Sequence, residues 1–92
     1  IDINGDRDTS GNTLFIVAAQ NGNKRIMKEL LRKGADPNLA NERGNTALHF
    51  LIAYNHRELA DYLIEKGAID TVTNEEGLTP WEGLSKEDVD RI

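Results

Sequence analysis

Two histidines, His49 and His56, are the side chains of this sequence best suited to acid–base catalysis or metal binding at neutral pH. A metal or catalytic site would also need carboxylate or cysteine partners at helical spacing, as in H-E-x-x-H, and neither histidine has them. The sequence has no serine with a matching base and no G-x-x-x-x-G-K-[ST] phosphate loop. Because there is no cysteine, thiolate chemistry, disulfides and zinc–cysteine sites are excluded. We therefore expect no enzymatic activity, no cofactor and no bound metal.

An acidic segment near the start of the chain is the other possible metal site. Residues 2–8 read D-I-N-G-D-R-D, which approximates the calcium-loop pattern D-x-[DN]-x-[DN]-G. The glycine comes too early, however, and no glutamate stands at the twelfth position. We interpret this segment as a solvated loop.

The composition and charge of the chain exclude some classes of binding partner. The chain has 92 residues and a formal net charge of −5, which disfavours attraction to nucleic-acid phosphates or anionic lipid. No apolar run approaches the roughly 18 residues that a membrane span requires. The absence of cysteine fits a reducing, cytoplasmic compartment. Another protein is therefore the expected partner, without nucleic-acid binding or membrane insertion, and no feature indicates an oligomeric state.

The elements that carry these residues follow an internal repeat of 33 residues. Gly11, Gly44 and Gly77 are each followed, two residues later, by a threonine. The same spacing relates further pairs of identical residues, which are Leu30 and Leu63, Gly34 and Gly67, Ala35 and Ala68, and Asn41 and Asn74. Such a period indicates an array of similar supersecondary units.

Each unit contains two stretches whose apolar residues have helical spacing. They span residues 14–19 and 26–31 in the first unit, and 48–52 and 59–64 in the second. Gly22 separates the two stretches of the first unit. In the second unit, Asn55 stands at the position equivalent to Gly22. Asparagine tolerates a left-handed backbone better than other non-glycine residues, so we expect the same turn in both units. Each unit is predicted to be helix, turn, helix, with polar loops linking successive pairs.

Two motifs within these units resemble a known family. Gly44-Asn45-Thr46-Ala47-Leu48-His49 resembles G-x-T-P-L-H, and Gly34-Ala35-Asp36-Pro37-Asn38 resembles G-A-D-V-N, both of which mark the ankyrin repeat. The resemblance implies an all-α fold, an ankyrin-repeat solenoid of stacked helix-turn-helix pairs joined by hairpin-like loops. It divides a single domain, residues 1–92, into the end of a preceding repeat (1–7), two repeats (8–40 and 41–73) and an atypical C-terminal capping repeat (74–92).

The capping repeat departs from the family pattern after Leu84. There Ser85-Lys86-Glu87-Asp88 approximates a capping box that opens a last short helix. Trp81 takes a core leucine position of the pattern, so we expect it to pack under the cap, with a partly exposed partner anchor as the alternative.

The resemblance also gives structural roles to several side chains. His49 is expected to brace the loop, and His56 to open the second helix of its unit. Leu51 and Ile52 stand where the family usually has small alanines, and they predict bulkier packing. One helix carries a basic outer face, interpreted as solvated or, alternatively, as a contact with a neighbouring domain, and its residues are Lys24, Arg25, Lys28, Arg32 and Lys33.

An ankyrin-like fold implies a protein-interaction scaffold that binds through a concave face of hairpin tips and inner helices. The contact positions implied by the resemblance are Thr9, Ser10, Asn12, Gln20, Asn21, Glu42, Arg43, Asn45, Ala53, Tyr54, Glu75, Glu76 and Leu78. Because this face becomes acidic toward its C-terminal end, we expect a partner with a basic patch. Asn38 has the spacing of the hairpin asparagine that intracellular hydroxylases modify in some ankyrin proteins, with structural hydrogen bonding as the alternative.

Two further functions stay open. The missing initial methionine and the partial first repeat favour a regulatory or spacer module within a larger enzyme or channel. Two whole repeats are also fewer than the three that repeat arrays usually need, so flanking repeats or self-association are expected to add stability. The other alternative is catalytic or ligand-binding chemistry of the domain itself, which thermal-shift screening against nucleotides and metals would exclude.

Overall fold

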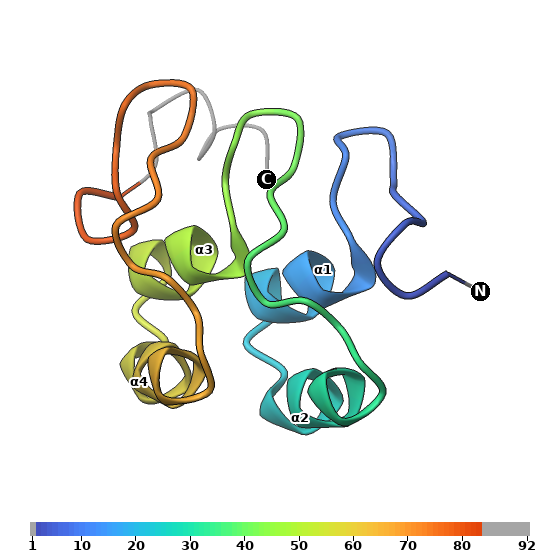
Figure 1. Cartoon of the computed structure of the whole chain (residues 1–92). Coiled ribbons are helices and arrows are strands. Elements are labelled where there is room, and N and C mark those ends of the chain that lie inside the picture. Colours follow the sequence, from blue (N-terminus) through green and yellow to red (C-terminus); the bar gives the residue numbers. More distant parts are fainter. Residues whose placement is uncertain (1, 84–92) are drawn as a thin grey trace.

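The computed structural model describes residues 2–83 of the chain. Within them the backbone forms four helices: α1 (Leu14–Gln20), α2 (Lys24–Arg32), α3 (Ala47–Ala53) and α4 (Arg57–Glu65). Figure 1 shows two helix pairs side by side, with α1 beside α3 and α2 beside α4, while long loops project from the α1 and α3 side. The only strand-like pairing among these residues is one bridge between Ala40 and Thr46. The predicted all-α fold of stacked helix-turn-helix pairs is confirmed.

Residues at the helix starts fix where the helices begin. Thr13 accepts a hydrogen bond from the N–H of Ile16 at the start of α1. At the start of α3, Thr46 and His49 form a reciprocal capping box. Such bonds satisfy backbone donors that the first helical turn leaves unpaired. His56 precedes α4, as predicted, although its side chain makes no capping bond.

The turn within each helix pair depends on one left-handed residue. Gly22 has φ +62° and Asn55 has φ 64°, so the prediction that asparagine replaces glycine in the second turn is confirmed. Beyond the outer helices, Gly34 and Gly67 also have positive φ, at +98° and +106°. Glycine adopts this conformation without the steric cost that a Cβ would add, so both outer helices can end just before these residues.

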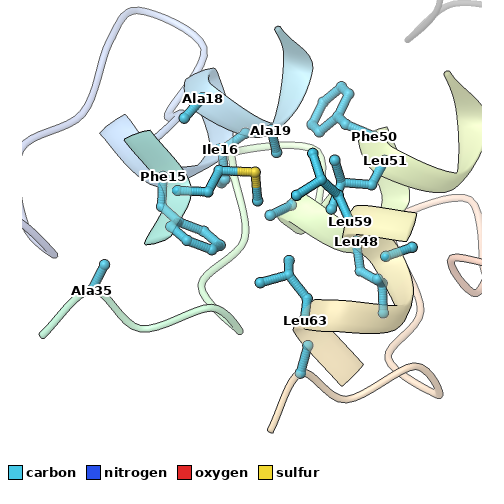
Figure 2. Close-up of a cluster of buried hydrophobic side chains, with 14 residues drawn as sticks. Phe15, Ile16, Ala18, Ala19, Ala35, Leu48, Phe50, Leu51, Leu59 and Leu63 are labelled. Carbon is cyan, nitrogen blue, oxygen red and sulfur yellow. The ribbon is translucent and has the colours of Figure 1, made fainter. Parts of the chain in front are cut away.

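A hydrophobic core joins the two helix pairs (Figure 2). It is largely aliphatic, with Phe15 and Phe50 as its aromatic members. Leu51 is 0% exposed and Ile52 is half-buried, and the bulkier packing expected at these positions stays a prediction. Burying one such side chain stabilises a fold by roughly 1.5–3 kcal/mol, whereas helices this short are marginal alone. Packing between the pairs therefore maintains the helices.

The third unit is described as far as Gly83, so the predicted capping box at residues 85–88 lies outside the described residues. Trp81 does not enter the core. Its side chain is 42% exposed, which corrects the expectation that it packs at a core leucine position. The indole Nε1–H donates to Asp70 Oδ2 at 2.9 Å, and the Arg57 guanidinium carbon lies 4.7 Å from the ring centroid. Polar and cationic partners therefore hold this ring at the surface.

Candidate functional site

Three five-residue loop tips, at residues 8–12, 41–45 and 74–78, lie in a row along one edge of the molecule (Figure 1). In each tip the N–H of the first residue donates to the carbonyl oxygen of the fifth, at 3.0, 2.9 and 2.9 Å in chain order. The first residues are Asp8, Asn41 and Asn74. Their side-chain oxygens accept from the N–H groups of the third and fifth residues of the tip. These Asx-type bonds shape each tip without a regular sheet.

Side-chain amides join each tip to the next. Asn41 Nδ2 donates to Asn12 Oδ1 at 2.9 Å, and one repeat later Asn74 Nδ2 donates to Asn45 Oδ1 at 2.8 Å. Both acceptor residues are buried, with Asn12 8% and Asn45 1% exposed. Because these two side chains are used inside the protein, we leave Asn12 and Asn45 out of the proposed contact surface, although the sequence placed both in it.

Backbone bonds strengthen the same row. The Glu42 N–H donates to the Ser10 carbonyl oxygen at 3.1 Å, and the Glu75 N–H donates to the Arg43 carbonyl oxygen at 3.0 Å. Gly44 has φ +79°, and a Cβ on it would lie 3.0 Å from the Asn74 Cα and the Glu75 backbone N. Glycine therefore allows neighbouring tips to approach. A surface held in this way loses little conformational entropy when it binds a partner.

His49 is fully buried and connects α3 to the third tip. Its Nδ1 accepts from the backbone N–H of Thr46 at 3.1 Å, which assigns the ring proton to Nε2. Nε2 donates to the Leu78 carbonyl oxygen at 2.9 Å. The predicted loop-bracing role is confirmed, and the imidazole offers no base that solvent or substrate can reach.

Asn38 belongs to a second row of bonds, near the ends of the outer helices. Its Oδ1 accepts from the Ile69 N–H at 2.8 Å, and its Nδ2 donates to the Gly67 carbonyl oxygen at 3.2 Å. Asn4 makes the equivalent two bonds one repeat earlier, at 2.8 and 3.1 Å. Asn38 therefore makes the structural hydrogen bonds that were the alternative to hydroxylation. Its hydroxylation stays a prediction.

A groove of about 310 Å³ lies between the first and second tips. It brings together exposed or half-buried members of the predicted contact set, which are Thr9, Ser10, Gln20, Glu42 and Arg43. Asp8 also lines this groove but was not among the predicted contacts. Its 33-residue spacing from Asn41, and again to Asn74, was the sequence signal that could have found it.

Asp8 gives the groove a negative charge. Burial raises the pKa of its carboxyl, but hydrogen bonds from Asn12 and Ser10 outweigh burial and lower the pKa below the ordinary value of 3.8. The N–H groups of Ser10 and Asn12 both lie 2.9 Å from Oδ1. The carboxyl group is therefore ionised at neutral pH.

The buried Asn12 and Asn45 also line this groove, whereas the other predicted contact residues lie outside its lining. Tyr54 is half-buried, its ring centroid lies 6.1 Å from that of Phe50, and burial raises the pKa of its phenol. Leu78 is half-buried, and the remaining members are exposed, which are Asn21, Ala53, Glu75 and Glu76. Arg43 Nη2 lies 3.9 Å from Glu76 Oε1, so a weak ion pair connects the second and third tips.

Within residues 2–83, no three histidine, aspartate or glutamate side chains gather closely enough to hold a metal ion. The same residues include no helix with the length and apolar character needed to span a membrane.

Paired short helices, repeated along the chain and joined by hydrogen-bonded tips, define a helical repeat solenoid. A sequence profile described as "Ankyrin repeats (3 copies)" matches residues 1–80. The chain therefore belongs to the ankyrin repeat family. Ankyrin repeats are generally protein-interaction modules and are typically not catalytic.

Several curated proteins are similar to this chain. The E3 ubiquitin-protein ligase KEG of Arabidopsis thaliana is 37% identical over 76 residues, which cover 80% of this chain and 5% of the ligase. The ankyrin repeat-containing protein P1E11.10 of Schizosaccharomyces pombe is 33% identical over 64 residues, or 70% of this chain and 31% of that protein. The ADP-ribosylation factor GTPase-activating protein AGD2 of Arabidopsis thaliana is 35% identical over 69 residues, or 75% of this chain and 9% of that protein. The chain thus spans less than a third of the length of each of these relatives.

Proposed function

We propose that this chain binds another protein through the face formed by its loop tips and inner helices, with the groove between the first and second tips at the centre of contact. The row of joined tips supports this proposal most directly, because its backbone is held by amide and main-chain bonds while side chains such as Ser10 and Glu42 stay exposed. A fixed backbone with free polar side chains favours specific recognition of a protein surface.

The charges of the tips support a basic partner. Asp8 is ionised in the groove, and Glu42, Glu75 and Glu76 are exposed on the second and third tips. Arg43 is the opposing charge, and its side chain is only 21% exposed beside Glu76. Complementary charges increase association rates and exclude partners of the wrong sign.

Site-specific photo-crosslinking tests the proposed face. A photoreactive amino acid at Ser10 should form adducts with the partner in cells, whereas the same group at Asp61, exposed on α4, should not. Adducts formed only from Asp61 would contradict the proposal.

The proposed basic partner needs its own test. Once the partner is identified, Glu75→Lys with Glu76→Lys should weaken its affinity by at least about tenfold. The matched control is Glu58→Lys with Glu65→Lys, which changes net charge equally on the outer surface of α4 and should leave the affinity nearly unchanged. Unchanged affinity for the tip variant would refute charge complementarity.

A second proposed role is that of one module within a longer protein, and the α1–α2 side of the stack favours it. Leu14 and Ile26 are 43% and 47% exposed, whereas Ala47 and Leu59, one repeat later, are 0% and 6% exposed. The two exposed side chains line an apolar groove of about 190 Å³, which Asn21 also lines. We propose that a further helix pair, preceding Asp2, covers this face of α1 and α2, in the same way as α1 and α2 cover the equivalent face of α3 and α4.

Grafting tests this second role. A copy of residues 8–35 joined to Asp2 should raise the Tm by several degrees, because burying these side chains adds about 1–2 kcal/mol. Ile26→Lys in the original repeat should change the Tm of the ungrafted chain little. In the grafted chain the same substitution should remove most of the increase in Tm. An equal gain with and without Ile26→Lys would show that the graft does not cover this face.

A further inference from the structure

A third groove lies between the outer helices α2 and α4. Its volume is about 570 Å³, and its lining consists of Lys28, Leu31, Arg32, Ala35, Pro37, Tyr62 and Lys66. Three of these residues are cationic and none is acidic, although the chain as a whole carries a net charge of −5. The groove therefore concentrates positive charge on an acidic protein.

The Tyr62 ring contacts two of these cations. The Lys28 Nζ lies 5.1 Å from the centroid of the Tyr62 ring, and the Lys66 Nζ lies 5.6 Å from it. The face of an aromatic ring attracts each ammonium group, so Tyr62 keeps both lysine side chains at the groove. A carboxylate bound in the groove would be attracted by both positive charges.

The fold itself does not require positive charge at these positions. One repeat later, Asp61 stands where Lys28 stands and Glu65 stands where Arg32 stands, 33 residues apart in each case. All four side chains are exposed on their helices. Lys66 does recur, since Lys33 stands one repeat earlier, but the positions of Lys28 and Arg32 accept either sign. The charge of these two residues is therefore a property of this groove and not of the repeat.

The rest of the lining indicates what kind of anion fits. Leu31 and Pro37 are half-buried and Ala35 is 6% exposed, so an apolar surface lies beside the charged groups. Arg32 is paired with Glu29 on its own helix, and both side chains remain largely exposed. A peptide with acidic residues around one aliphatic side chain matches this combination of charge and apolar surface.

A flat anionic membrane matches the groove between α2 and α4 less well than a peptide does. Glu58, Asp61 and Glu65 are exposed on α4, the helix that forms one side of the groove. A lipid surface wide enough to meet α2 would also approach these carboxylates and be repelled, whereas a narrow peptide can lie in the groove alone.

We propose that the groove between α2 and α4 is a second binding site, which takes a short acidic peptide segment of a partner protein, with Lys28 and Lys66 contacting its carboxylates. This site is separate from the loop tips and does not depend on what binds there.

NMR titration of the whole chain tests this site. The probe is an acetylated, amidated peptide of sequence EELEE, with QQLQQ as its uncharged match. The acidic peptide should shift the amide signals of residues 28–37 and 62–66, and added salt should weaken its binding. QQLQQ should produce no comparable shifts.

Matched variants locate the contact. Lys28→Gln with Lys66→Gln should weaken EELEE binding by about tenfold, equivalent to two lost charge contacts. Lys24→Gln with Lys33→Gln removes the same charge from exposed positions outside the lining and should weaken binding by less than about twofold. Equal weakening by both pairs would mean diffuse attraction without a site and would overturn the proposal.

Two other outcomes would also overturn it. One is the absence of EELEE-induced shifts at low salt. The other is binding to phosphatidylserine vesicles that depends on Lys28 and Lys66 while EELEE does not bind, which would assign the groove to a membrane surface. Crosslinking from Ser10 should be unchanged in Lys28→Gln with Lys66→Gln, so the two proposed sites can fail separately.

Discussion

Single polar side chains hold the loop tips in place, and His49 is the most deeply buried of those described, at 0% exposure. It serves two segments at once, accepting from Thr46 and donating to Leu78. A buried group of this kind is costly to remove, because its partners lose hydrogen bonds in a site that water enters poorly.

His49→Ala should destabilise the chain by about 2–4 kcal/mol, since it opens a cavity, removes the partner of the buried Thr46 N–H and leaves the Leu78 carbonyl oxygen with its bond from the Asn74 N–H alone. Urea unfolding followed by circular dichroism measures this change. His56→Ala should cost under about 1 kcal/mol, because the ring is half-buried and caps no helix. Similar costs for both histidines would contradict the bracing role of His49.

Asp8 should make part of the stability depend on pH. Its pKa is lowered in the folded state, so its contribution is present above the ordinary value of 3.8 and is lost as pH falls through the lower folded value. The native chain should therefore lose stability relative to Asp8→Asn as the pH falls below the ordinary value of 3.8. Parallel pH profiles of unfolding free energy for the two proteins would rule this contribution out.

Sequence reasoning at this scale succeeded for His49 and failed for Trp81. The role of His49 followed from a motif with a fixed position relative to a helix start. The prediction for Trp81 rested on the leucine position of the family pattern, which Leu48 occupies within α3, whereas residues 79–83 are not helical and the Trp81 ring lies at the surface. Asp8 was missed because the repeat shows itself through identical residues, and Asp8 differs in type from Asn41 and Asn74 at the equivalent positions.

At the scale of elements, the helices are short and depend on their turns and partners. α1 and α3 have 7 residues each, and α2 and α4 have 9. Apolar spacing predicted all four, because one face of each helix packs into a shared core and leaves a helical pattern in the sequence. The depth of the grooves was not predictable, since it depends on how side chains from different helices pack.

The turn between α3 and α4 should respond to substitution according to its φ of 64° at Asn55. Asn55→Gly should be neutral or slightly stabilising, because glycine adopts this conformation freely. Asn55→Ala should destabilise the chain by about 1 kcal/mol. Thermal unfolding of both variants measures the difference, and a more stable alanine variant would contradict the left-handed turn.

At the scale of the whole molecule, the stack presents two different surfaces. The loop tips are joined by the amides of Asn41 and Asn74 and carry exposed acidic groups, whereas the groove between α2 and α4 is basic. The 33-residue repeat predicted the stack, because equal spacing places equivalent residues side by side. It did not distinguish buried from exposed tip residues, since Asn12 and Ser10 have similar polarity and differ only in their neighbours.

Hydrogen–deuterium exchange of the whole chain, with and without the partner captured from Ser10, tests the central claim most directly. Binding at the tips should slow exchange at residues 8–12 and 41–45, where backbone N–H groups lie beside the groove, and leave α2 and α4 unchanged. Slower exchange confined to α2 and α4, with no change at the tips, would contradict the account.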